Sequence, residues 1–234
     1  MLFLWWVAVV SIISLGGSWY ARRFGRTDAL LALYVVLALV AQIAATKIMA
    51  VTIGGIVWTV PAGVVAFSVT FLLADIVNER FGRAETIRMI TIALATQIVA
   101  FLVFVFALNA PAAPWWHGQD AFAFVIGSSL RIAVAGWVAF WASETIDAYL
   151  FAWFKRMSRG KHLWMRTVFS SLPSMAVDSG IFVVLAFWGV APIWQLICGQ
   201  IAAKWIIAVA DVPFMYANRA VLYARGAQTN NVAQ

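Results

Sequence analysis

Eight charged side chains lie inside otherwise apolar stretches of this 234-residue sequence. The bases are Lys47, Arg131 and Lys204, and the acids are Asp75, Glu144, Asp147, Asp178 and Asp211. A charge at the centre of a bilayer costs roughly 3 kcal/mol on insertion scales, so such residues rarely face lipid. We therefore expect them to line a water-filled cavity or to pair inside a helix bundle. Because acids outnumber bases, pairing cannot neutralise every carboxylate if all are ionised, so some are protonated, solvated or left to meet a ligand.

The spacing of these residues favours a shared inner face. Glu144 and Asp147 are three positions apart, and Glu79 follows Asp75 by four, so each pair lies on one side of a helix. Any one of the charges can equally serve as a structural ion pair between helices. Buried ion pairs are weak stabilisers, however, and so the whole set indicates binding rather than stability alone.

The elements that must position these charges are membrane-spanning helices. Hydrophobic residues make up 65% of the chain and charged residues 11%, against about half and a quarter in a soluble domain. Seven apolar segments are long enough to cross roughly 30 Å of hydrocarbon: about 2–19, 29–53, 58–77, 87–108, 121–154, 167–190 and 193–217. We predict a single all-α domain over 1–234, a polytopic membrane helix bundle. Its six-helix core is 29–217, preceded by an additional helix over 1–20 and followed by a polar tail over 226–234.

Basic residues occur in alternate loops, which indicates the orientation of the bundle. Arg22, Arg23, Arg26, Arg80, Arg83, Arg88, Lys155, Arg156, Arg159, Lys161, Arg166, Arg219 and Arg225 fall in the first, third and fifth loops and the C-terminal tail. By the positive-inside rule, the N-terminus is outside and the C-terminus is in the cytoplasm, in a cytoplasmic (inner) membrane. The net charge of +7 is thus a topology signal, and we expect no nucleic-acid partner.

Enzymatic and metal chemistry find little support in the sequence. The two histidines, His117 and His162, fall in loops on opposite sides of the predicted membrane, and Cys198 is the single cysteine. We expect no metal or cofactor, and no phosphate-binding loop of the ATPase type is present. Two alternatives to a solute-binding cavity remain. One is an intramembrane protease with Asp147 and Asp178 as a dyad, and the other is a structural subunit.

Two short motifs resemble each other. Ser143 precedes Asp147 by four positions, and Ser174 precedes Asp178 by four. The match is either chance between two apolar helices or a duplicated half-site, since many transporters bind substrate at the interface of internal repeats.

Several motifs together resemble the queuosine precursor transporter family, also called the vitamin uptake transporter family. They are the block from Phe71 to Gly82 (FLLADIVNERFG), the two Ser-Asp motifs, and Lys204 followed by Asp211-Val-Pro-Phe-Met-Tyr216. The resemblance covers about 29–216. The sequence departs from the family pattern at Glu144 and Met175, where glutamine often follows the serine.

The resemblance implies import of 7-deazaguanine bases, precursors of queuosine, across the lipid bilayer. Asp147 and Asp178, helped by Glu144, would bind the base through paired N–H groups, and Lys47, Arg131 and Lys204 would position these acids or contact a carbonyl oxygen. Asp75, Glu79 and Asp211 complete the candidate site. A homo-oligomer or a separate energising subunit is possible, and the alternative function is the substrate-binding membrane subunit of a multi-component vitamin or nucleobase importer.

Overall fold

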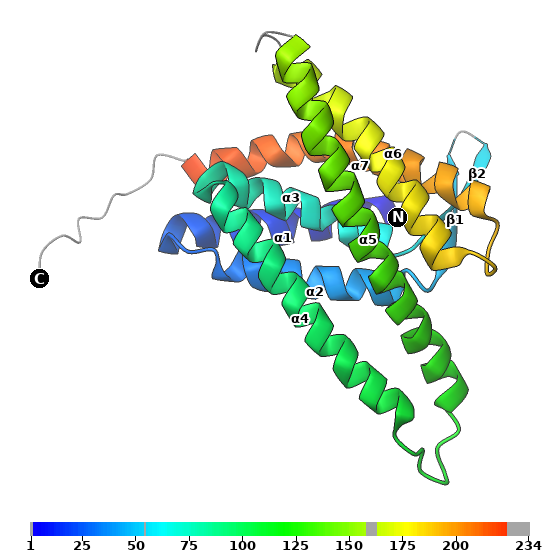
Figure 1. Cartoon of the computed structure of the whole chain (residues 1–234). Coiled ribbons are helices and arrows are strands. Elements are labelled where there is room, and N and C mark those ends of the chain that lie inside the picture. The colour runs from blue at the N-terminus through cyan, green and yellow to red at the C-terminus, as the bar shows by residue number, and fades with distance from the viewer. Residues whose placement is uncertain (1, 54, 158–162, 224–234) are drawn as a thin grey trace, which may run out of the picture.

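Seven helices and one β-hairpin make up the part of the chain that the structure, a computed structural model, describes (Figure 1). The described residues are 2–53, 55–157 and 163–223, without the side chains of 2–4, 53, 83, 144, 145, 147–157, 163–172 and 208. The elements are α1 (Leu2–Phe24), α2 (Asp28–Ala44), β1 (Ile48–Ile53), β2 (Ile56–Pro61), α3 (Val64–Phe81), α4 (Arg83–Asn109), α5 (Gln119–Met157), α6 (Leu163–Phe187) and α7 (Ile193–Tyr223). The predicted helical bundle is confirmed.

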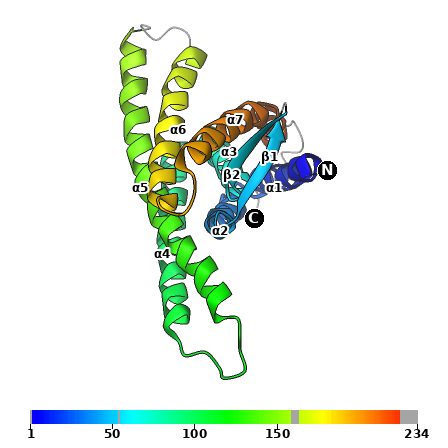
Figure 2. The ribbon, with the colours of Figure 1, turned by 90° about the vertical axis from the view of Figure 1, so that its right-hand side faces the viewer.

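The helices form two groups. α4 lies between them, and α7 belongs to the first group but also contacts the second. α1, α2, α3 and α7 pack beside one another, whereas α5 and α6 pack together along their length (Figure 2). α4 contacts α2, α3 and α5, and α7 contacts both α6 and β2. α7 therefore connects the α5–α6 pair to the rest of the bundle.

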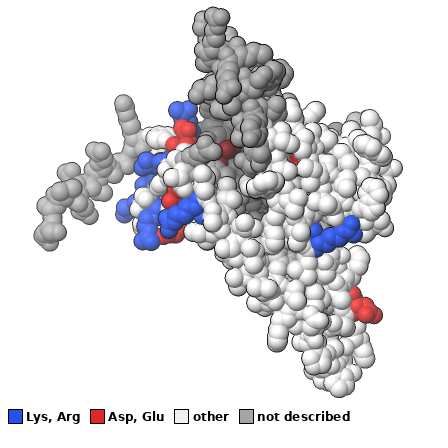
Figure 3. Space-filling model, viewed as in Figure 1, with Lys and Arg blue, Asp and Glu red and all other residues white. Residues whose placement is uncertain are grey.

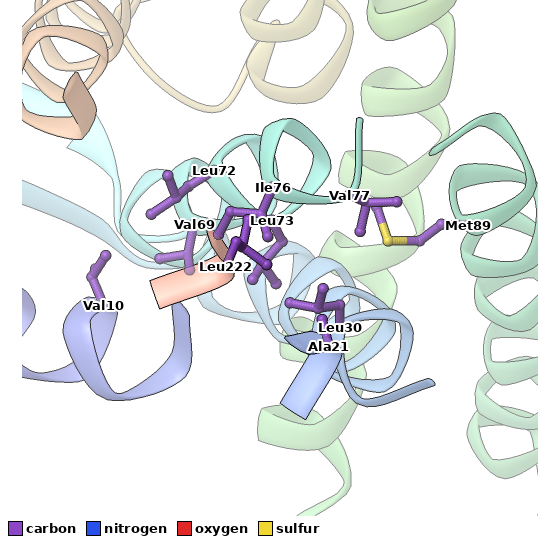
Figure 4. Close-up of a cluster of buried hydrophobic side chains, with 10 residues drawn as sticks. All are labelled: Val10, Ala21, Leu30, Val69, Leu72, Leu73, Ile76, Val77, Met89 and Leu222. Atoms are coloured by element: carbon purple, nitrogen blue, oxygen red, sulfur yellow. The ribbon is translucent and has the colours of Figure 1, made fainter. Parts of the chain in front are cut away.

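The main apolar core joins the first group of helices. Val10 and Ala21 of α1, Leu30 of α2 and Leu222 of α7 surround a row of buried α3 side chains (Figure 4). That row contains Val69, Leu72, Leu73, Ile76 and Val77. These α3 residues recur every three or four positions, so one side of α3 is fully covered. Beside the core, Ser18 Oγ of α1 donates a 2.7 Å hydrogen bond to Asn218 Oδ1 of α7.

Large apolar side chains also cover much of the outer surface. On α4, Leu102 is 65% exposed and Phe106 is 75% exposed, and on α5 Trp141 is 73% exposed. Within the described residues, three helical stretches are long and apolar enough to cross a membrane: Ala84–Asn109, Gln119–Ser143 and Ile193–Tyr223. Asp28–Ala44 and Pro173–Phe187 are shorter apolar helices. Exposed apolar helices of this kind are stable in lipid, as expected for a multi-pass membrane protein.

The second apolar segment is not one continuous helix as predicted. α2 ends at Ala44, and 48–61 form an antiparallel hairpin in which Ile48 pairs with Pro61 and Ile53 with Ile56. A short apolar run rich in β-branched residues fits a strand as well as a buried helix. Gly55, with φ of +81°, supplies the turn, a conformation that favours glycine. Lys47 consequently lies between α2 and β1 and not within a helix.

The ends of several helices meet where the charged residues gather. Figure 3 shows most of the visible blue and red atoms at one end of the molecule, while the rest of that face is largely uncharged. Arg22 Nη1 of α1 donates to the Val221 carbonyl of α7, and Thr27 Oγ1 donates to Glu85 Oε1 of α4 over 2.7 Å. Gly82, with φ of +86°, forms the tight turn from α3 to α4. This charged end therefore unites the first loop, the α3–α4 turn and the end of α7.

Candidate substrate-binding site

One cavity of about 1210 Å³ lies between α2, both ends of α3, α4, α5, α6 and α7. Small-molecule pockets have volumes of about 300–1,000 Å³, so a base-sized solute would fill only part of it. Its lining combines rings, amides and one pair of opposite charges. The rings are Tyr34, Phe67, Trp137, Phe140, Trp141 and Phe182, and the principal polar side chains are Gln42, Asn78, Thr86, Gln97, Asp178, Gln200 and Lys204.

Asp178 of α6 and Lys204 of α7 form an ion pair in the wall of this cavity. The Lys204 side chain is 6% exposed and that of Asp178 is 15% exposed, and Lys204 Nζ contacts Asp178 Oδ2. Ser143 Oγ of α5 is 3.5 Å from Asp178 Oδ1, but it lies 3.0 Å from the Phe140 carbonyl oxygen, the stronger acceptor by distance. Asp178 Oδ1 thus retains capacity to accept a hydrogen bond from a solute.

A second polar group in the cavity wall consists of two amides and an indole. Gln97 Oε1 of α4 accepts from Trp137 Nε1 over 3.2 Å and from Gln42 Nε2 over 2.5 Å. Gln97 is 6% exposed. The Trp137 ring also packs edge-on against Phe101 of α4, with centroids 6.2 Å apart. The group therefore ties α2, α4 and α5 together at the cavity.

Sequence patterns did not single out these amides. Gln42, Gln97 and Gln200 carry no charge, so they do not stand out in apolar helices as lysine or aspartate does. A usable signal was present nonetheless, because an uncharged amide in a membrane helix normally hydrogen-bonds across to another helix. Gln42 and Gln97 do this.

Two glycines allow close packing beside the cavity. A Cβ atom on Gly63 would collide with the carbonyl oxygen of Ala41 in α2, and one on Gly199 would collide with that of Thr59 in β2. Gly63 lines the cavity, and Gly199 precedes Gln200. The absence of a side chain at both positions therefore sets how closely the hairpin and α3 approach the site helices.

Arg131 has a structural partner away from the cavity lining. Its Nε atom donates to the Leu185 carbonyl over 2.8 Å, and its Nη2 atom donates to the Trp188 carbonyl over 2.9 Å. These carbonyls belong to the last turn of α6 and the residues beyond it, where backbone acceptors lack helical partners. Arg131 therefore caps α6.

Four other candidates also lie outside the cavity lining in the described part of the chain. Lys47 is exposed, and Glu79 Oε1 is 3.3 Å from Arg219 Nε at the charged end. Asp75 and Asp211 lie on neighbouring helices, α3 and α7, close enough for their carboxylates to repel each other.

The side chains of Glu144 and Asp147 lie outside the described residues, although α5 continues through both positions. The side chain of Arg166, one of the basic residues of the predicted fifth loop, is outside them as well. Ser143 and Ser174, which begin the two similar motifs, are both buried, on the adjacent helices α5 and α6. The duplicated half-site stays a prediction.

Comparison with known proteins identifies the family to which the chain belongs. The chain is 26% identical over 168 residues to a Bacillus subtilis (strain 168) protein described as "Probable queuosine precursor transporter", covering 70% of this chain and 73% of the relative. No solved structure matches. The family model described as "Putative vitamin uptake transporter" matches residues 61–218, which include α3 to α6, all but the last five residues of α7 and most of the cavity lining. The chain therefore belongs to the vitamin uptake transporter family, a family of membrane transporters and not of enzymes.

Proposed function

We propose that this transporter imports 7-deazaguanine precursors of queuosine, 7-cyano-7-deazaguanine and 7-aminomethyl-7-deazaguanine. The observation that carries the proposal is the joint lining of one cavity by an Asp178–Lys204 ion pair and several aromatic rings. The described function of the Bacillus subtilis relative supports the same class of substrate.

The chemistry of the cavity suits a flat base with polar edges. Asp178 Oδ1 can accept from a ring N–H or exocyclic amine, a charge-assisted hydrogen bond. Trp137 and Phe140 offer ring faces or edges to an aromatic solute, and base–aromatic stacking is worth about 1–3 kcal/mol. Lys204 pairs with the other carboxylate oxygen, Oδ2, and so leaves Asp178 Oδ1 as the acceptor for the solute.

Asp147 and Glu144 complete the site in this proposal. They are three positions apart, so they share a side of α5, and Ser143 of the same helix reaches Asp178. An acidic cavity of this kind also suits the aminomethyl precursor, which is a cation.

The placement of charge indicates how the transporter is oriented in the membrane. We infer that the charged end of the molecule is cytoplasmic, with the N-terminus outside, in the inner membrane. Asn78 and Thr86, close to the α3–α4 turn, line the cavity at that end. A cavity that reaches the cytoplasmic end is what an importer with alternating access would present when it releases its solute.

Uptake by the purified protein in liposomes tests the proposal. We expect saturable uptake of radiolabelled 7-cyano-7-deazaguanine, competed by the unlabelled aminomethyl base but not by riboflavin or thiamine. An Asp178→Asn variant with a normal size-exclusion profile should lose uptake. Competition by a vitamin and not by the deazaguanines would contradict the proposed substrate while leaving the family intact.

A further inference from the structure

The hydrogen bonds around Gln97 fix which end of its amide faces the cavity. An indole N–H is a donor only, so the atom of Gln97 that meets Trp137 Nε1 must be the carbonyl oxygen. The same oxygen also meets Gln42, which must then present its own NH₂ group. Two donors on one acceptor thus hold the Gln97 amide in a single orientation.

This orientation leaves the NH₂ group of Gln97 without a hydrogen-bond acceptor among the described residues. Gln97 is only 6% exposed, yet it lines the cavity. The Nε2 atom is not among the fully buried side-chain atoms that lack a partner, so it is accessible from the cavity. An acceptor on a solute in the cavity would satisfy it.

We propose that Gln97, oriented by Trp137 and Gln42, is a specificity-determining residue that donates a hydrogen bond to a carbonyl oxygen of the transported base. The inference rests on the proposed function. It adds which group donates and which accepts in one hydrogen bond between the protein and its solute. With Asp178 as an acceptor in the same cavity, the site offers a donor and an acceptor. It is therefore complementary to a base edge that has a carbonyl next to N–H groups, and it disfavours an amino group in place of that carbonyl.

The role of Gln200 differs from that of Gln97. Gln200 is also 6% exposed and lines the cavity, but no described group fixes its amide, and its Oε1 atom is buried without a partner. Of these two amides, Gln97 is the one whose orientation the surrounding residues determine, so it carries the inference.

Binding of two matched ligands to the full-length purified protein tests the inference. The ligands are 7-cyano-7-deazaguanine and its 2,6-diamino counterpart, in which an amino group replaces the ring carbonyl and the neighbouring ring nitrogen loses its hydrogen. We expect the wild type to bind the carbonyl form at least about 10-fold more tightly, because the diamino form would place a donor against a donor. Gln97→Glu keeps the acceptor for Trp137 and Gln42 but replaces the NH₂ group by oxygen, and it should reduce the preference to the part that the ring N–H and Asp178 contribute.

Trp137→Phe provides a second, independent variant. Phenylalanine keeps an aromatic ring but lacks the N–H donor. The Gln97 amide can then rotate and present either its NH₂ group or its oxygen to the ligand. The preference should fall toward unity even if Gln97→Glu does not fold. Gln195→Glu is the matched control, because this exposed α7 residue lies outside the cavity lining, and it should keep the wild-type preference.

The outcomes separate this inference from the proposed function. A wild type that binds neither ligand contradicts both. A wild type that binds the carbonyl form, together with Gln97→Glu or Trp137→Phe variants that fold and keep the full preference, overturns the role of Gln97 alone. A reduced preference in the folded variants but not in Gln195→Glu supports it.

Discussion

Lys204 of α7 contacts the Asp178 carboxylate of α6 in the wall of the cavity of about 1210 Å³, and both side chains are mostly buried. The two residues are 26 positions apart in the chain. They come together because α6 and α7 are packed neighbours joined by a short turn after Phe187. The pair therefore has two effects: it holds α6 and α7 together, and it places polar groups in the cavity wall.

Removing one member of the pair should destabilise the protein and abolish transport. Lys204→Met leaves the Asp178 carboxylate without its counter-ion, and breaking a buried pair costs about 3–5 kcal/mol. We expect a lower melting temperature in detergent and no deazaguanine uptake.

The double variant Asp178→Asn/Lys204→Met separates stability from function. It removes both charges, so much of the lost stability should return, whereas uptake should stay absent. Uptake restored with stability would show that the pair is structural only.

Arg131 is expected to support stability without binding substrate. Arg131→Met removes two hydrogen bonds to the end of α6, and bonds from a charged donor are worth about 1.5–3 kcal/mol each when buried and less at an exposed site such as this. The melting temperature should fall while the Kd for 7-cyano-7-deazaguanine stays within about twofold. Arg131→Lys should recover only part of the loss, because one ammonium group lacks the planar fork that reaches both carbonyls. A marked rise in Kd at unchanged stability would instead place Arg131 in the site.

Gly199→Ala tests the close approach of α7 to the hairpin. The added Cβ meets the Thr59 backbone carbonyl, which has little room to move. Overpacking of this kind costs about 1–3 kcal/mol, and displacement of the adjacent Gln200 should weaken substrate binding. Gly127→Ala on α5, where an added Cβ meets nothing within 4 Å, is the control and should be neutral or slightly stabilising. Equal effects of the two substitutions would contradict the packing argument.

The helical elements were predictable because long apolar segments have few alternatives in lipid. The hairpin was not, since the run that contains β1 continues the apolar character of α2, and only Gly54 and Gly55 hinted at a turn. Lys47 was assigned to a helix for the same reason.

The candidate site was predictable only where a residue is costly in lipid. Asp178 and Lys204 stand out in apolar helices, and the structure brings them together in a cavity. Sequence spacing could not distinguish them from Arg131, which has the same charge as Lys204 but caps a helix. Gln97 and Trp137 could not be singled out from the sequence. Their role depends on a hydrogen bond between two residues that are 40 positions apart in the chain, and not on their residue types.

The most direct test of the central claim is equilibrium binding of radiolabelled 7-cyano-7-deazaguanine to the purified protein and to two matched variants, Asp178→Asn and Asp211→Asn. Both substitutions remove one intramembrane carboxylate, but only Asp178 lines the cavity. We predict saturable wild-type binding, about 10-fold or greater weakening in Asp178→Asn, and a Kd within about twofold of wild type in Asp211→Asn. Wild-type affinity in a folded Asp178→Asn variant, or equal weakening in both variants, would contradict the assignment of the substrate to this cavity.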